Sequence, residues 1–103
     1  MRISIVSAAV LLLTLSGCSG PGPRTRGQRA LAAGRHERAV ALLRQAMAEE
    51  DDLQRDPEFR QSLQRAYRGA AATRYRKALE AADAGRLDEA RTHLARALQY
   101  DPD

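Results

Sequence analysis

Few side chains in this 103-residue chain have the chemistry of a reactive site. The single cysteine, Cys18, lies where an apolar run ends and a stretch rich in glycine and proline begins. A thiolate is a strong nucleophile, so Cys18 is the first candidate for a functional residue. The two histidines, His36 and His93, occupy non-equivalent places in the chain, and we expect both on the surface rather than in a catalytic or metal-binding pair.

An acidic segment, Glu49–Glu58, is the other candidate for chemistry, because it holds six Asp and Glu residues around one arginine. It lacks the turn glycine and the terminal glutamate of an EF-hand calcium loop, so a solvated helix end followed by an N-cap is the favoured interpretation. The sequence also contains no H-E-x-x-H, no G-x-G-x-x-G and no C-x-x-C motif. We therefore expect no catalytic residue, no metal site, no cofactor and no enzymatic activity.

The segment before Cys18 has the pattern of a secretory signal. Arg2 supplies a positive start, and an apolar run from Ile3 to Leu15 follows it. The run is too short to cross a bilayer, which takes about 20 apolar residues. Residues 1–17 are therefore expected to form a signal peptide and to take no part in the fold.

The last residues of that segment, Leu15, Ser16 and Gly17 followed by Cys18, resemble a bacterial lipobox. The resemblance implies that the thiol receives a diacylglyceryl group, that the signal is cut before Cys18, and that the new amine is acylated. The alternative is an ordinary cleaved signal that leaves a free thiol, for which the chain has no second cysteine. By the same resemblance, Ser19 agrees with sorting to the outer membrane, facing the periplasm, rather than with retention at the inner membrane.

Residues 18–26 are expected to form the lipidated cysteine and a flexible tether, because glycine and proline alternate from Gly20 to Pro23. Arg24, Arg26 and Arg29 lie beside this anchor. Two interpretations stay open for them, contact with anionic headgroups and simple solvation.

The remaining chain, 27–103, is expected to be an all-α domain. Its apolar residues recur every three or four positions, and no segment alternates like a strand. Ala33–Asp52 aligns without gaps to Ala84–Asp103, with seven of 20 positions identical, which indicates an internal duplication. Much of the apolar content is alanine, so we expect a thin core of modest stability.

Capping residues place the expected helices at 24–33, 36–50, 57–84 and 87–100, with a loop at 51–56. Gly34 and Gly85 end the helices before them, and the Asp-Pro pairs at 56–57 and 101–102 start one helix and stop another. A lone extra helix is the alternative to the long one. The duplicated helices should each bury one face, formed by Ala39, Leu43, Ala46 and Met47 and by Ala90, Leu94, Ala97 and Leu98.

The segment "GRLDEARTHLARALQYDP", Gly85–Pro102, resembles the second-helix signature of the tetratricopeptide repeat (TPR). Gly34–Met47 matches the same signature at its glycine, alanines and leucine but departs from it at His36. Gly34 and Gly85 are 51 positions apart, whereas one TPR is 34 residues. The resemblance implies TPR-like antiparallel hairpins, about four helices with one long central helix, that bind other proteins.

The expected function is that of a lipid-anchored interaction scaffold or assembly adaptor in the cell envelope. A pilotin-like escort of an outer-membrane secretin, and a structural lipoprotein that acts through its anchor and basic residues alone, are the alternatives. Two hairpins are fewer than the roughly three repeats a stable array needs, so the partner is expected to be an envelope protein or a second copy. Nucleic acid is not expected outside the cytoplasm, and no aromatic residues interleave the bases on the polar face of the helix.

The segment Phe59–Leu79 carries six basic residues and no acid. It is either a solvated face or a basic strip for an acidic partner or anionic lipid. The candidate partner-binding residues lie along it and in the last helix: Tyr67, Tyr75 and Tyr100 for contact area, with Arg68, Arg74 and Arg76 to steer an acidic partner.

The first prediction concerns the anchor. Cys18→Ala should abolish lipidation and leave an unprocessed precursor, because the thiol is the atom to be modified. Metabolic labelling with a fatty acid, read by gel mobility, measures both effects. Ser19→Ala, which keeps the thiol, should be labelled and processed normally. Mature Cys18→Ala protein that still partitions into detergent would contradict the lipoprotein assignment.

Overall fold

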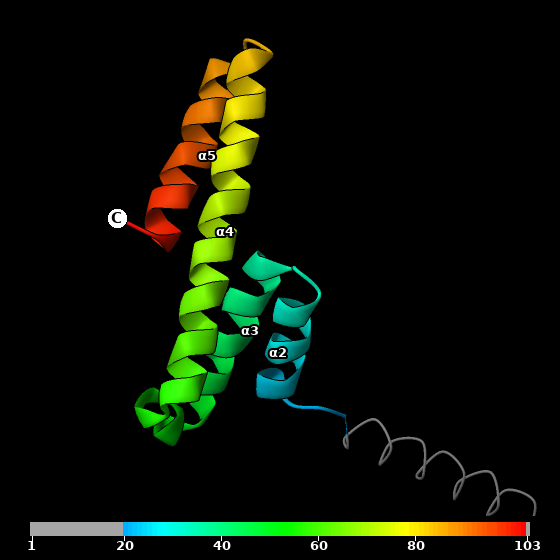
Figure 1. Ribbon diagram of the computed structural model, residues 1–103, viewed down its shortest axis with the longest axis vertical. Helices are drawn as coiled ribbons and strands as arrows, with labels where there is room; N and C mark the ends of the chain where they lie inside the picture. Colours follow the sequence, from blue (N-terminus) through cyan, green and yellow to red (C-terminus); the bar gives the residue numbers. More distant parts are fainter. Residues whose placement is uncertain (1–19, 103) are drawn as a thin grey trace, which may run out of the picture.

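The computed structural model describes residues 20–102, and the expected signal peptide and Cys18 lie outside them. The described chain forms helices α2 (Pro23–Ala32), α3 (His36–Glu49), α4 (Pro57–Asp83) and α5 (Leu87–Tyr100), with a 3-10 helix η1 (Asp51–Arg55) before α4 (Figure 1). No strand occurs in this part of the chain. The expected all-α fold of four helices is therefore confirmed.

The four helices form two hairpins joined through α4. α2 and α3 pack against each other, α3 packs on the first half of α4, and α5 folds back along its second half (Figure 1). α4 contains 27 residues and is unbroken, so at 1.5 Å per residue it is about 40 Å long. This confirms the single long helix and excludes the lone extra helix. Every packed helix lies between residues 23 and 100, so a fragment that starts at Gly20 contains the whole folded body.

The start of α4 follows from its capping residues. The Asp56 side chain accepts hydrogen bonds from the backbone N–H groups of Glu58 and Phe59, at 3.0 and 3.4 Å, and Pro57 occupies the first turn. The acidic segment thus supplies an N-cap, as expected. The expected loop at 51–56 is instead mostly the 3-10 helix η1. Within it, the Leu53 side chain is buried in the core cluster and packs this connection against the helices.

Both hairpins turn in the same way. Gly34 and Gly85 have φ values of +75° and +79°, a region that favours glycine. In each turn the next residue donates its N–H to a carbonyl five residues back, Arg35 to Ala30 and Arg86 to Ala81, both at 2.8 Å. These are Schellman-type helix ends. The duplicated segments therefore share one backbone conformation, and α3 and α5 begin and end at equivalent positions.

The expected tether, 18–26, overlapped the expected first helix, 24–33, and the structure agrees with the helix. α2 starts at Pro23, after Gly22 as N-cap, so the expected tether bound was wrong. Proline is well suited to the first helical position, because its missing N–H has no partner there in any helix. The tether is therefore shorter than expected, and Arg24 and Arg26 belong to α2.

The larger buried side chains lie at one end of the molecule. Leu43 and Phe59 are the largest fully buried side chains, and they belong to a cluster formed by α2, α3, η1 and the first half of α4. Phe59 is only 1% exposed. Along the second half of α4 and α5 the buried residues are all small, namely Ala78, Ala81, Ala90 and Ala97.

The expected burial of Leu94 and Leu98 was also wrong. They are 39% and 60% exposed, whereas Leu43, the equivalent of Leu94 in the first hairpin, is fully buried. The physical reason is that the two hairpins differ in the helices that pack on them. Leu43 packs against Gly27 of α2 and lies in the cluster that α3 shares with the first half of α4, whereas α4 is the only described helix that packs on α5.

Close approach of α3 to α4 depends on Gly69. This glycine does not bend α4, which is unbroken. A Cβ atom at this position would overlap the imidazole of His36, so the glycine leaves space for the His36 side chain. His36 is half-buried in consequence, and the His93 side chain is only 15% exposed. The expectation that both histidines lie on the surface was therefore wrong.

The second prediction compares equivalent leucines. In the fragment from Gly20, Leu43→Ala should lower the free energy of unfolding by about 2–5 kcal/mol, because it leaves a cavity in the core. Leu94→Ala removes the same atoms from a half-exposed site and should cost less than about 1.5 kcal/mol. Urea unfolding followed by circular dichroism measures both. Equal losses in the two variants would mean that the two hairpins are equally well covered.

Candidate functional site

The candidate residues gather in two places. The first, which we call the junction, lies where α3, α4 and α5 meet and contains Glu37, Tyr67, Arg74, His93 and Tyr100. The second, which we call the apolar face, lies over the second half of α4 and α5 and contains Tyr75, Leu79, Leu87, Leu94 and Leu98.

Hydrogen bonds to one carboxylate connect the helices at the junction. Arg74 Nε donates to Glu37 Oε1 at 2.7 Å, and the Tyr100 hydroxyl donates to the same oxygen at 3.1 Å. Arg74 Nη1 lies 3.0 Å from His93 Nδ1. An arginine can only donate, so His93 accepts at this nitrogen. Glu37 of α3 thus contacts Arg74 of α4 and Tyr100 of α5, and His93 of α5 contacts the same arginine.

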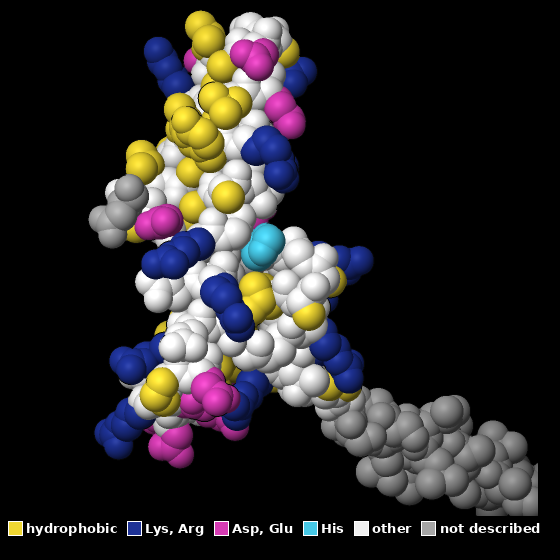
Figure 2. All heavy atoms as spheres, in the orientation of Figure 1, with side chains coloured by type: hydrophobic (Ala, Val, Ile, Leu, Met, Phe, Trp, Pro, Cys, Tyr) yellow, Lys and Arg dark blue, Asp and Glu magenta, His cyan; other side chains and the backbone are white. Residues whose placement is uncertain are grey.

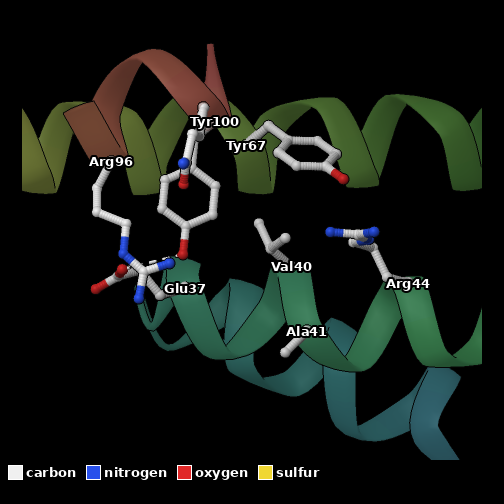
Figure 3. Close-up of a pocket in the computed structure, with 8 residues that line it drawn as sticks. Glu37, Val40, Ala41, Arg44, Tyr67, Arg96 and Tyr100 are labelled. Atoms are coloured by element: carbon white, nitrogen blue, oxygen red, sulfur yellow. Dashed lines mark hydrogen bonds between the residues drawn. The ribbon is translucent and has the colours of Figure 1, made fainter.

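Aromatic packing completes the junction. The rings of Tyr67 and Tyr100 lie 6.3 Å apart at 50° to one another, a tilted pair. Figure 3 shows Tyr100 pointing from α5 toward Glu37, with Tyr67 beside it and Val40 beneath. The hollow they line measures about 330 Å³ and is open to solvent. Because α5 otherwise packs on α4, Tyr100 is the side chain that fastens it to α3.

The ionisation of the junction follows from these contacts. Burial by itself raises the pKa of the Glu37 carboxyl, but hydrogen bonds from Arg74 and Tyr100 and the charges of Arg74 and Lys77 outweigh it, so the pKa lies below its ordinary value. The pKa of Tyr100 is raised, first by burial and then by its hydrogen bond to the Glu37 carboxylate and by that negative charge. Glu37 is therefore ionised and Tyr100 neutral at neutral pH.

The apolar face is the second gathering of candidate residues. Its five side chains are 39–63% exposed, and they are the large hydrophobic residues that stand out to solvent in the described chain. In Figure 2 the hydrophobic side chains collect over the end of the molecule formed by α4 and α5. A groove of about 450 Å³ runs between the two helices and is lined by Arg68, Ala71, Ala72, Tyr75, Leu94, Ala97, Leu98 and Asp101.

The structure therefore divides the six predicted partner-binding residues. Tyr67, Arg74 and Tyr100 are engaged within the chain at the junction. Arg68 and Tyr75 line the apolar groove, and Arg76 is exposed on α4. Arg68 and Tyr75 stand together at the apolar groove, whereas Tyr67 and Tyr100 line the solvent-open hollow of the junction.

The basic residues of α4 do not form one strip. Arg65 faces α2 beside Gln28 and donates to Ser62, Arg68 faces α5 at the groove, and Arg74 reaches Glu37 on α3. Successive residues of a helix turn by 100°, so Arg65, Arg68 and Arg76 lie on one side of α4, whereas Arg74 points to another. The six bases therefore do not all share one face, and the docking of an acidic partner or anionic lipid on Phe59–Leu79 stays a prediction.

Sequence reasoning missed several residues of both surfaces. Glu37, Leu79 and Leu87 were not among the candidate residues, and His93 was expected on the surface. In all of these the residue type and the helix face were visible in the sequence, but the neighbouring helix was not.

Other kinds of site were searched for over residues 20–102. No three His, Cys, Asp or Glu side chains of this segment converge in a way that could hold a metal ion. None of its helices is long and apolar enough to cross a membrane. No protein-family model, no curated protein and no solved structure matches the chain.

The third prediction uses the Glu37 carboxylate. Because its pKa is lowered on folding, the stability it contributes is fully present above about pH 4.5, the ordinary value, and is lost as the pH falls through the folded value. Glu37→Gln should lower the free energy of unfolding by about 1 kcal/mol at pH 7, since the site is partly exposed.

The difference between Glu37→Gln and the parent should shrink as the pH is taken below 4.5. Glu80→Gln, which makes the same change at an exposed position of α4, serves as the control. Urea unfolding across the pH range measures both. A Glu37→Gln deficit that stays constant into the acid range would show that the carboxylate charge does not hold the junction.

Proposed function

We propose that this protein is a lipid-anchored adaptor of the bacterial cell envelope, held at the outer membrane by Cys18 and facing the periplasm. Its TPR-like hairpins bind a partner protein through the apolar face. The observation that carries the proposal is that face itself. Its five large side chains are 39–63% exposed, and large apolar patches on the surface of a monomeric protein are often functional.

The internal duplication indicates what kind of segment covers the apolar face. In the first hairpin, Leu43 and Met47 belong to the cluster with Phe59, Leu63 and Ala66 of α4. The equivalents of Leu43 and Met47 in the second hairpin are Leu94 and Leu98, which are exposed. The occupant that repeats the first hairpin's packing is an amphipathic helix laid against α4 and α5.

The groove has a shape and a charge that fit such a helix. Its floor consists of alanines, and Tyr75, Leu94 and Leu98 form its walls, so large side chains of a partner helix find room between them. Arg68 and Asp101 are the charged residues that line the groove. We therefore propose a helix with aliphatic or aromatic residues at i, i+4 and i+7 that lies beside this pair of opposite charges.

The TPR-like assignment is supported by the shared turn of the two hairpins and by the match of Gly85–Pro102 to the family's second-helix signature. The anchor-only alternative is weakened by Arg74, one of the bases of α4, because its guanidinium is engaged with Glu37 in the junction. The anchor-only alternative also requires no apolar groove, and so it gives the exposed leucines of the apolar face no role.

The fourth prediction tests the face in living cells. A photo-crosslinking amino acid at Leu98 in the full chain should yield a discrete adduct with one protein, because this side chain is 60% exposed in the groove wall. The same probe at Ala48, which is exposed on α3, is the control and should yield none. Mass spectrometry of the adduct identifies the partner.

A second substitution checks that the adduct reports binding. Leu94→Glu in the probe-bearing chain should remove the adduct, because it places a charge in an apolar groove. An adduct made only with the chain itself would indicate a second copy as the occupant. The absence of any adduct at Leu98, in protein that is lipidated and folded, would refute the adaptor assignment and favour the anchor-only alternative.

A further inference from the structure

A surface of arginines on the first hairpin has no role in the junction or the apolar face. Arg26 and Arg29 of α2, Arg35 of the turn and Arg38 of α3 line one hollow of about 350 Å³, whose floor includes Ala30 and Ala33. We call these four residues the arginine surface. In Figure 2 basic side chains stand along the outer edge of the α2–α3 hairpin.

The helix geometry explains why these bases lie together. Arg26, Arg29, Ala30 and Ala33 follow the i, i+3, i+4, i+7 spacing of one helix face. The turn at Gly34 then brings Arg35 and the first turn of α3 beside that face. The two alanines are short, so the guanidinium groups stand out above a shallow floor.

The charge of this surface is not neutralised within the described chain. α2 contains no acidic residue, and none of the four arginines forms an ion pair with a residue of 20–102. Glu37 lines the adjoining hollow, but its carboxylate is engaged by Arg74 and Tyr100. Four like charges kept together without counter-charges cost free energy in the monomer, which an anionic ligand would relieve.

We propose that the arginine surface binds the headgroups of anionic phospholipids and lays the α2–α3 hairpin on the bilayer. The biological setting rests on the proposed lipid anchor, since only residues 19–22 lie between Cys18 and α2. Such a segment reaches at most about 15–20 Å, so an anchored chain holds these guanidinium groups near the headgroups. Arginine suits phosphate because its planar group donates two parallel hydrogen bonds.

The test uses the unlipidated fragment from Gly20, which contains the whole folded body. Its binding is measured by co-sedimentation with vesicles of phosphatidylcholine alone and of about three parts phosphatidylcholine to one part phosphatidylglycerol. Binding is expected only to the anionic vesicles, and it should fall when salt shortens the screening length. The triple variant Arg26→Gln, Arg29→Gln, Arg38→Gln should partition at least about tenfold more weakly, because each base contributes roughly a fivefold factor.

A matched variant distinguishes this surface from net charge. Arg60→Gln, Arg76→Gln, Arg91→Gln removes the same charge from exposed positions outside the surface and should bind nearly as well as the parent. Equal losses in the two triple variants would overturn the proposal, as would no binding to anionic vesicles. Binding of the fragment to polyglutamate but not to vesicles would also overturn it, and would identify an acidic protein as the ligand.

The failure of this proposal can be told apart from failure of the adaptor function. Leu98→Glu, which disrupts the apolar face, should leave vesicle binding unchanged, because Leu98 lies on α5 and the arginine surface lies on α2 and α3. Loss of vesicle binding in Leu98→Glu that remains folded by circular dichroism would place the lipid contact on the apolar face instead.

Discussion

The continuity of α4 is the constraint on which the rest of the structure depends. One helix begins at the Asp56 cap, passes the glycine that admits His36, and ends at the Gly85 turn without a break. A straight helix of about 40 Å is longer than either partner that packs on it. Its two halves therefore belong to different hairpins, and each half is packed by a different neighbour. A break at Gly69 would have let the second hairpin stack on the first, as in a regular array.

The division of α4 explains why the two ends of the molecule differ in packing. The first half contacts helices on the α2–α3 side and buries leucine, valine and phenylalanine side chains. The second half has α5 alone among the described helices, and alanines fill the contact. Small residues bring two helices close but remove little apolar area from water, so this end gains less from the hydrophobic effect. The junction compensates in part, because Tyr100 and Arg74 fasten the weaker hairpin to α3 through one ionised carboxylate.

Most of the fold could be predicted from the sequence because its boundaries depend on local chemistry. Asp56-Pro57, Gly34, Gly85 and Asp101-Pro102 act within a few residues of themselves, and the helices end where these residues predict. The burial of Leu94 could not be predicted in the same way. Periodicity identifies the apolar face of a helix, but whether another helix covers that face depends on tertiary packing.

The candidate site shows the same limit. Tyr67, Arg74 and Tyr100 have the composition of a partner-binding surface, and yet they contact one another or Glu37 within the chain. The sequence separation of Glu37 and Tyr100, 63 positions, gives no local signal for their contact. Arg68 and Tyr75 directly follow Tyr67 and Arg74 in the chain, but they face the groove because successive residues of a helix turn by 100°.

The positions of the two proposed surfaces relate the anchor to the partner. The arginine surface belongs to α2 and α3, whereas α5, which lines the apolar groove together with α4, lies on the other side of the long helix (Figure 1). In the proposed arrangement, a hairpin bound to the bilayer through its arginines keeps α5 apart from the lipid contact. This separation matters physically, because an exposed leucine face next to a membrane would partition into the interface and would no longer be open to a protein. The unbroken α4 keeps the two surfaces apart, since an uninterrupted helix has no hinge through which the second hairpin could fold back onto the first.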